Sequence, residues 1–335
     1  TEARAILASH CLGFGSFQGY VHSVSYGFQR LRGFRRIEGR EAYRREEDQY
    51  GYRYDSFSER KSSARYPICH VSILACHARI VGMAKRLVIG NWKMNPETFE
   101  AAKAIARKTR AVCARLNNTE VVVCPPFPFI SAATSRKEIS GFHIGAQSVS
   151  LEAAGPHTGQ VNSQMLKSLG VEFVIAGHSE ERAAGVINAD ISRKVSMILD
   201  AGLTAVVCFG EKARDESGTH LDFLKSQIKE TFANVQAEKV RNIVLAYEPV
   251  WAIGAKEAMQ PELVYEMSLF VKKVFSDVFG QEAGHKVRVL YGGSVNFRNA
   301  SDIVKIGKVD GLLVGRESVN MPGFKELIKA VDAIS

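Results

Sequence analysis

The sequence predicts an α/β protein built as a closed (β/α)8 barrel, preceded by an Arg-rich extension that we expect to be disordered. Three observations support the barrel. Short apolar runs recur at regular intervals from Met83 onward and alternate with amphipathic stretches, as βα units do. The runs are apolar along their whole length, which is typical of parallel strands buried on both faces. Eight such units in the 253 residues of 83–335 match the usual size of this barrel.

Each expected strand is a short run that is often rich in β-branched residues. In chain order the runs are Leu87–Ile89, Val121–Cys124, Phe142–Ala146, Phe173–Ala176, Ala205–Cys208, Ile243–Tyr247, Val287–Tyr291 and Gly311–Val314. An open doubly wound sheet is the alternative. It is disfavoured because Gly90-Asn91-Trp92-Lys93 follows the first run, where a dinucleotide-binding fold has a glycine-rich turn.

The stretches between these runs predict helices, and the first of them shows why. Asn95 is the expected N-cap, and Pro96 suits the first helical position. The residues that follow at helical spacing form one apolar face. They are Ala102, Ile105, Ala106, Thr109, Val112, Cys113 and Leu116.

The first 82 residues differ in composition from the rest of the chain. Residues 1–82 contain 12 Arg and one Lys, residues 83–335 contain 12 Arg and 19 Lys, and Met83 is the first methionine. We therefore expect a single catalytic barrel over 83–335 and an extension over 1–82 that is a leader, a fusion remnant or translated non-coding sequence. An organelle-targeting segment and a nucleic-acid-binding arm are alternatives, but interspersed acids such as Glu46 and Asp48 weigh against both.

Composition, net charge and cysteine spacing argue against a membrane protein, a nucleic-acid-binding protein and a zinc protein. No apolar run approaches the roughly 18 residues of a membrane span, so we expect no membrane association. The net charge is +9, to which the Arg-rich extension contributes, and we expect no nucleic-acid partner. The six cysteines show no CxxC pair and no zinc-like spacing, which favours a reduced, cytoplasmic compartment and predicts no metal.

Polar residues that follow the expected strands are the candidate site, because active sites of such barrels lie at the carboxyl ends of the strands. In chain order they are Asn91, Lys93, His178, Glu248, the turn Gly292-Gly293-Ser294, and Gly315. Glu248 offers a general base, and the stretch from Pro249 through Trp251 to Gly254 offers a loop that can close over it.

The other groups complement that base. His178 precedes a short expected helix, whose N-terminus favours a neutral, donating imidazole. Lys93 supplies a cation for an oxyanion. The glycine turns after the last two strands, together with Gly254, can direct main-chain N–H groups at a phosphate. Together these groups predict proton transfer next to a carbonyl on a small phosphorylated substrate.

Several separate motifs then carry a resemblance to a known family. They are Gly90 to Asn95, Gly145-Ala146-Gln147, Thr158-Gly159, Gly177 to Glu180, Cys208 with Gly210-Glu211, Ala246 to Gly254, Tyr291 to Val295, and Gly311 to Gly315. In this order they resemble the triosephosphate isomerase family across residues 84–335, and thereby its TIM barrel.

The resemblance implies a specific reaction and specific roles. The chain is expected to interconvert dihydroxyacetone phosphate and D-glyceraldehyde 3-phosphate through an enediolate, in glycolysis and gluconeogenesis, without a cofactor. Glu248 would move the proton and His178 would polarise the carbonyl. Asn91 and Lys93 would assist, and Glu180 would hold Lys93 in position.

The resemblance also implies binding and assembly residues. Main-chain N–H groups of Gly254, Ser294, Gly315 and Arg316 would bind the phosphate. A lid would comprise Pro249, Val250, Trp251, Ala252, Ile253, Gly254, Ala255 and Lys256, and continue to about Met259. A homodimer is expected, in which the loop at Thr158 and Gly159 enters the neighbouring subunit's active-site region.

The chain departs from the family pattern at three places. Glu181 stands where the family usually has arginine, and Gln160 replaces the acid that commonly pairs with it across the dimer, so we expect no stranded charge. Arg316 replaces a glycine, and the lid is about one residue short. A phosphate-binding barrel with weak catalysis, using residues 1–82 as an interaction arm, is the alternative function. The complete set of chemical groups disfavours it.

Overall fold

The computed structural model describes residues 85–134 and 138–334, and the extension predicted at 1–82 lies outside these residues. Eight parallel strands form a closed barrel in sequence order. Because β1 pairs with both β2 and β8, the predicted (β/α)8 barrel is confirmed and the open sheet is excluded. The strands are β1 (Arg86–Asn91), β2 (Thr119–Cys124), β3 (Phe142–Ala146), β4 (Phe173–Ala176), β5 (Thr204–Phe209), β6 (Ile243–Tyr247), β7 (Arg288–Tyr291) and β8 (Gly311–Val314).

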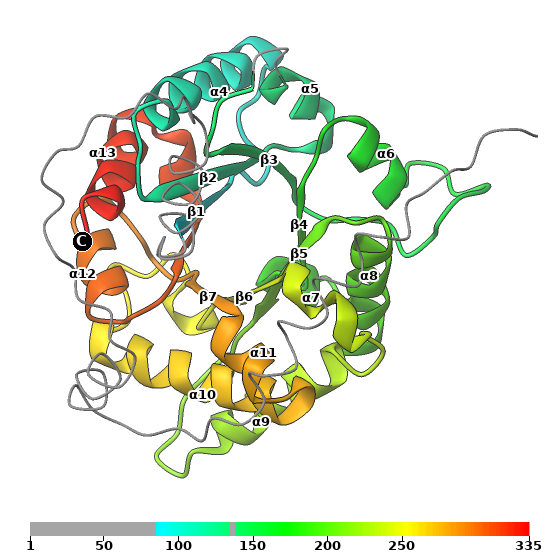
Figure 1. Ribbon diagram of the computed structural model, residues 1–335, viewed down its shortest axis with the longest axis vertical. Helices are drawn as coiled ribbons and strands as arrows, with labels where there is room; N and C mark the ends of the chain where they lie inside the picture. Colours follow the sequence, from blue (N-terminus) through cyan, green and yellow to red (C-terminus); the bar gives the residue numbers. More distant parts are fainter. Residues whose placement is uncertain (1–84, 135–137, 335) are drawn as a thin grey trace, which may run out of the picture. The chain divides into compact units, whose positions relative to one another are not determined.

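Helices surround this barrel as an outer ring (Figure 1). The α-helices are α4 (Phe99–Cys113), α5 (Ile130–Ala133), α6 (Ser163–Ser168), α7 (Ser179–Ala183), α8 (Asn188–Asp200), α9 (Thr219–Thr231), α10 (Pro261–Phe279), α11 (Gln281–Lys286), α12 (Ala300–Lys305) and α13 (Met321–Asp332). Short 3-10 turns are η2 (Phe127–Phe129), η3 (Ala237–Asn242), η4 (Val250–Ala252) and η5 (Arg316–Val319).

The strands are apolar throughout because both of their faces are buried. Alternate residues point to opposite faces of a strand. One set fills the barrel interior and comprises Leu87, Ile89, Val122, Cys124, Phe173, Ile175, Val206, Cys208, Val244, Ala246, Leu290 and Leu313. The alternate set, which includes Val88, Val121 and Val174, belongs to the larger core shared with the helices.

The first helix begins later than the sequence suggested. Helix α4 starts at Phe99, and its N-cap is Thr98, whose Oγ1 accepts from Ala101 N at 3.3 Å. The predicted cap at Asn95 is wrong, because that side chain donates to Trp92 O at 3.3 Å and remains within the preceding loop. The predicted apolar face is confirmed: four of its residues are buried, and Ile105, Val112 and Leu116 pack partly buried against the core.

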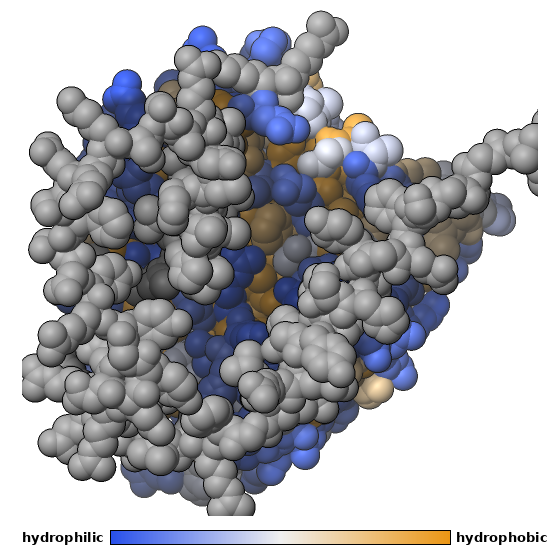
Figure 2. All heavy atoms as spheres, in the orientation of Figure 1, coloured by the Kyte–Doolittle hydropathy of each residue, from blue (hydrophilic) through white to orange (hydrophobic). Residues whose placement is uncertain are grey.

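The closed barrel places the loops after its strands on one rim. The loop between β3 and α6 extends away from the ring of helices (Figure 1). Its residues 152–160 are all exposed. At the centre of the barrel, Figure 2 shows hydrophobic surface with hydrophilic residues around it.

Candidate active site

A cavity of about 550 Å³ lies at the carboxyl ends of the strands. The structure brings to it the predicted residues Asn91, Lys93, His178, Glu180, Glu248, Gly254, Ser294, Gly315 and Arg316. Of the predicted lid, Ile253, Ala255 and Lys256 also line it. These residues come from loops after five different strands, so only the closure of the barrel brings them together.

Glu248 follows β6 directly and is 3% exposed. One carboxylate oxygen lies 3.3 Å from His178 Nε2, and the other accepts weakly from Ser179 N at 3.4 Å. Burial raises the pKa of Glu248, and the neighbouring His178, Cys208 and Ser179 only partly oppose this effect. A carboxylate that has lost its water shell is a stronger base than an exposed one.

Two glycines make room for Glu248, one beside its side chain and one beside its main chain. A Cβ on Gly292 would lie 2.7 Å from Glu248 Cγ, and one on Gly210 would lie 1.7 Å from the Glu248 carbonyl oxygen. Cys208 lies inside the barrel beside Glu248, and burial raises the pKa of its thiol well above the usual range. The thiol is therefore a packing group beside the base rather than a nucleophile.

His178 is the N-cap of α7, where the sequence predicted a short helix to begin. Its Nδ1 accepts from Glu180 N at 3.2 Å. Because Nδ1 is an acceptor, the ring proton lies on Nε2, which faces the cavity and Glu248. The imidazole is thus a neutral donor aimed into the site.

Lys93 reaches the same cavity from the loop after β1. Its Nζ lies 2.5 Å from Glu180 Oε1, and its side chain is 29% exposed. Its main chain has a positive φ of 53°, which is held by a bond from its N–H to Asn91 Oδ1 at 3.1 Å and by Gln147 Nε2 donating to its carbonyl at 2.8 Å. Its neighbour Trp92 is buried, whereas Met94 on the other side is 91% exposed.

The glycine-rich turns face Lys93 across the cavity. A Cβ on Gly315 would lie 3.6 Å from Lys93 Cε, so the ammonium and this turn can share one anion. Arg316 begins η5 and is exposed. Among the described residues other than glycine, positive φ occurs at Lys93 and Lys308, so Arg316 fits its position without left-handed geometry.

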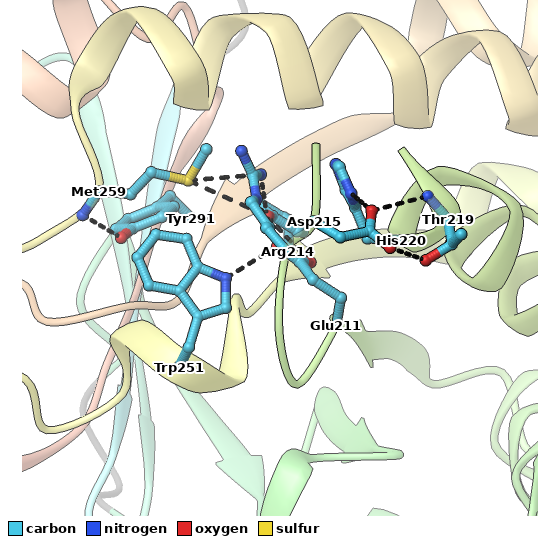
Figure 3. Close-up of polar contacts among 9 residues, drawn as sticks. Glu211, Arg214, Asp215, Thr219, His220, Trp251, Met259 and Tyr291 are labelled. Carbon is cyan, nitrogen blue, oxygen red and sulfur yellow. Dashed lines mark hydrogen bonds and ion pairs between the residues drawn. The ribbon is translucent and has the colours of Figure 1, made fainter. Parts of the chain in front are cut away.

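The predicted lid is anchored at both ends. At its start, Val250, Trp251 and Ala252 form η4, and Trp251 Nε1 donates to Glu211 Oε1 at 3.0 Å (Figure 3). At its end, Met259 N donates to Tyr291 Oη at 3.0 Å.

Between these anchors the lid is lightly held. Gly254 has a φ of +72°, and a Cβ there would meet nothing within 4 Å. Ser294 Oγ donates to Ala255 O at 2.8 Å. The loop has fixed ends and an uncrowded tip, which is the arrangement of a hinged segment.

Glu211 is the centre of the first anchor. It is 1% exposed and accepts from Tyr247 Oη at 2.8 Å and from Arg214 Nε at 2.8 Å (Figure 3 shows Glu211 and Arg214 beside Trp251). The sequence motif contained Glu211 without a role, and Arg214, Tyr247 and Tyr291 were missed as partners. Tyr247 and Tyr291 pair with residues more than 30 positions away, and Arg214, three residues from Glu211, also reaches Tyr247, so their sequence signal is weak.

The predicted dimer contact does not lie in the main cavity. Thr158 lines a separate hollow with Gln160 and Lys194, and Gly159 is exposed with a φ of +82°. Glu181 pairs with Lys194 of the same chain, a contact that the sequence did not predict.

A further groove on the outside of the barrel, by contrast, lacks the features of the active site. A groove of about 700 Å³ lies between α4 and α13, lined by apolar side chains and by Lys108, Arg115, Lys325, Lys329 and Asp332. It holds no histidine and no buried carboxylate. Across residues 85–134 and 138–334, no group of three or more His, Cys, Asp or Glu is placed to hold a metal ion. No helix in the same ranges is long and apolar enough to cross a membrane.

Comparison with known proteins agrees with this geometry. The family model for triosephosphate isomerase matches residues 86–331. The triosephosphate isomerase of Endomicrobium trichonymphae is 35% identical over 74% of this chain and 99% of its own length. The corresponding enzyme of Fusobacterium nucleatum is 38% identical over 73% of this chain and 99% of its own length. That of Flavobacterium johnsoniae is 36% identical over 74% of this chain and 100% of its own length.

Proposed function

Because this chain belongs to the triosephosphate isomerase family, we propose that it interconverts dihydroxyacetone phosphate and D-glyceraldehyde 3-phosphate in glycolysis and gluconeogenesis. The observation that carries the proposal is the shared cavity, where a buried carboxylate, a donating imidazole and an ammonium face one another. A coupled assay in both directions on the purified protein tests it. Phosphate binding without turnover would instead favour the weakly catalytic barrel.

The geometry supports proton transfer between the two carbons, together with a proton shift between their oxygens. Glu248 takes a proton from C1 of dihydroxyacetone phosphate, and the C–H electron pair forms the double bond of an enediolate. His178 Nε2–H donates to the oxygen that gains charge, and Lys93 stabilises that charge. His178 gives a proton to the oxygen on C2 and takes one from the hydroxyl on C1. Glu248 then returns its proton to C2, which yields the aldehyde at C1. Asn91 holds the main chain of Lys93, and Glu180 holds its ammonium.

The phosphate would lie on the other side of the cavity. Gly254, Ser294, Gly315 and Arg316 line this part, and main-chain N–H groups at such turns bind anions well. Closure of residues 249–259 over the phosphate would exclude water from the enediolate, a role for which this family is itself the standard example.

The pH dependence of catalysis follows from the burial of Glu248. The base acts in its ionised form, and burial raises its pKa above the ordinary 4.5. We therefore expect kcat/KM to fall on acidification with a limb above pH 4.5. Measuring kcat/KM over about pH 4–8, with the coupling enzyme in excess at each pH, checks this. If kcat/KM instead falls only at or below pH 4.5, the Glu248 carboxylate is exposed to water in the free enzyme.

Trp251→Phe tests the lid anchor. The change keeps an aromatic ring but removes the N–H that donates to Glu211. We expect kcat to change by about 3–10-fold, because lid motion often limits turnover, while the melting temperature changes little. If Trp251→Phe has the same kcat as wild type, the bond from Trp251 to Glu211 plays no part in turnover.

We further propose that the chain forms a cytoplasmic homodimer. Large apolar side chains are exposed on the loops and helices after the first four strands: Met94, Phe99, Phe127, Met165, Leu169 and Ile187. Exposed apolar surface of this kind commonly marks an interface. Sedimentation analysis tests the assembly. The buried thiols Cys113, Cys124 and Cys208 are unpaired, as suits a reducing compartment, and cell fractionation tests the location.

We also propose that residues 83–335 are the complete catalytic unit and that 1–82 are dispensable for it. The matched family region, 86–331, supports this boundary. Proteins that begin at Thr1 and at Met83 should have the same kcat and KM within about twofold. A large loss on truncation would assign the extension a catalytic role.

A further inference from the structure

A largely buried ion pair between Glu181 and Lys194 lies next to the turn that carries His178. The carboxylate of Glu181 accepts from Lys194 Nζ and from Ser148 Oγ, the latter at 2.6 Å. Lys194 Nζ also lies 3.0 Å from Ser148 Oγ. The two charged side chains are 16% and 9% exposed, so neither relies mainly on water.

This carboxylate also holds the main chain that carries His178. Glu181 is the third residue of α7, a position from which an acid commonly reaches back to an N–H before the helix. Here Oε2 accepts from Gly177 N at 2.9 Å. Arg182 Nε donates to Gly177 O at 2.8 Å, and Gly177 has a φ of +73°. Both polar groups of the residue before His178 are therefore fixed by side chains.

The same carboxylate joins two loops of the active-site rim. Ser148 lies in the loop after β3, and its neighbour Gln147 donates to Lys93 O at 2.8 Å and to Cys124 O at 2.9 Å. Glu181 thus connects the loop that holds the Lys93 main chain to the loop that presents His178.

The charge of this group is maintained by its partners. Burial opposes ionisation of Glu181, but the bonds from Lys194 and Ser148 outweigh it and hold the pKa of the carboxyl below its usual range. A buried ion pair adds little net stability compared with apolar residues of similar volume, while it fixes geometry. The arrangement is therefore better suited to orientation than to stability.

We propose that Glu181 is a positioning residue for the isomerisation, and that it sets His178 relative to Lys93 through Gly177 N–H and Ser148. Lys194 holds the carboxylate in place. The inference rests on the proposed function for its catalytic readout. It concerns Glu181, a position where this chain departs from the family pattern, so the arrangement is a feature of this chain rather than of that pattern.

Two double variants separate positioning from folding. Glu181→Met with Lys194→Met removes the acceptor and the charge together, so that no buried charge is left unpaired. We expect kcat to fall by about 10–100-fold, because small displacements of catalytic groups are costly, with KM changed by less than about threefold. Glu181→Gln with Lys194→Met keeps an acceptor for Gly177 N–H and should retain kcat within about threefold.

A readout that does not need activity accompanies the kinetics. Nitrogen NMR of labelled histidine, with His178→Gln to assign the resonance, reports which ring nitrogen carries the proton. Wild type and the Gln/Met variant should show the Nε2-protonated form. The Met/Met variant should show exchange between tautomers, because the Nδ1 contact to Glu180 N is loosened. Lys272→Met, which breaks an ion pair with Asp310 at the opposite end of the barrel, should leave the signal unchanged.

The outcomes decide the proposal. If the Met/Met variant keeps wild-type kcat and a single His178 tautomer, positioning by Glu181 is disproved. If that variant does not fold, Glu181→Asp decides: it still faces Lys194 but cannot span Ser148 and Gly177 together, and an unchanged kcat overturns the proposal. If wild type itself lacks isomerase activity, the proposed function fails, while the histidine signal still tests the positioning.

Discussion

Glu248→Gln is expected to lower kcat by about 10²–10⁴-fold, with a much smaller effect on KM. The amide keeps the shape of the carboxyl and can still accept from Ser179 N, but it cannot take a proton from carbon. Steady-state kinetics in both directions measure the loss. Glu262→Gln, at an exposed site in the first turn of α10, is the matched control and should retain wild-type kcat.

The same substitution is expected to stabilise the fold at neutral pH. The raised pKa of Glu248 means that its ionisation costs folding free energy once the pH rises through that pKa, and Gln removes this cost. Below the ordinary carboxyl pKa of 4.5 the wild-type group is protonated in both states, so the difference in melting temperature should vanish there. A Glu248→Gln protein with full activity, or with lower stability at neutral pH, would contradict the assignment of a dry base.

The barrel and its rim could be predicted because the relevant information is local in the chain. Each strand is a continuous apolar run, and the residue that ends the run is the one that faces the rim. Glu248, His178 and Lys93 follow such runs, so their meeting in one cavity needed only the closure of the sheet. Their chemical roles remain predictions until variants are measured.

Two kinds of feature could not be predicted: the choice between two competing N-caps, and contacts between residues far apart in the sequence. Asn95 and Thr98 are both good caps, and the adjacent Pro96 favoured the wrong one, because the bond from Asn95 to Trp92 O is a tertiary detail. The partners of Glu181 within its own chain were not predicted. Lys194 lies on α8 and Ser148 after β3, and only the packing of these elements brings them to one carboxylate.

His178→Gln is expected to lower kcat by about 10²–10³-fold, the usual cost of losing one donor to a developing oxyanion. The rigid imidazole presents an acceptor to Glu180 N on one side and a donor to the cavity on the other. Glutamine carries its acceptor and its donor on one terminal amide, so it cannot satisfy both directions with the same geometry. The rate should fall although a hydrogen-bond donor is still present.

The controls for His178→Gln follow from its two contacts. His285→Gln, on the exposed side of α11, should leave kcat unchanged. The melting temperature of His178→Gln should fall only slightly, since the lost cap serves a helix of five residues. If kcat instead stays within about threefold of wild type, carbonyl polarisation must come from Lys93, and Lys93→Met should then produce the large loss. The two variants together therefore decide whether the neutral imidazole of His178 or the ammonium of Lys93 polarises the carbonyl.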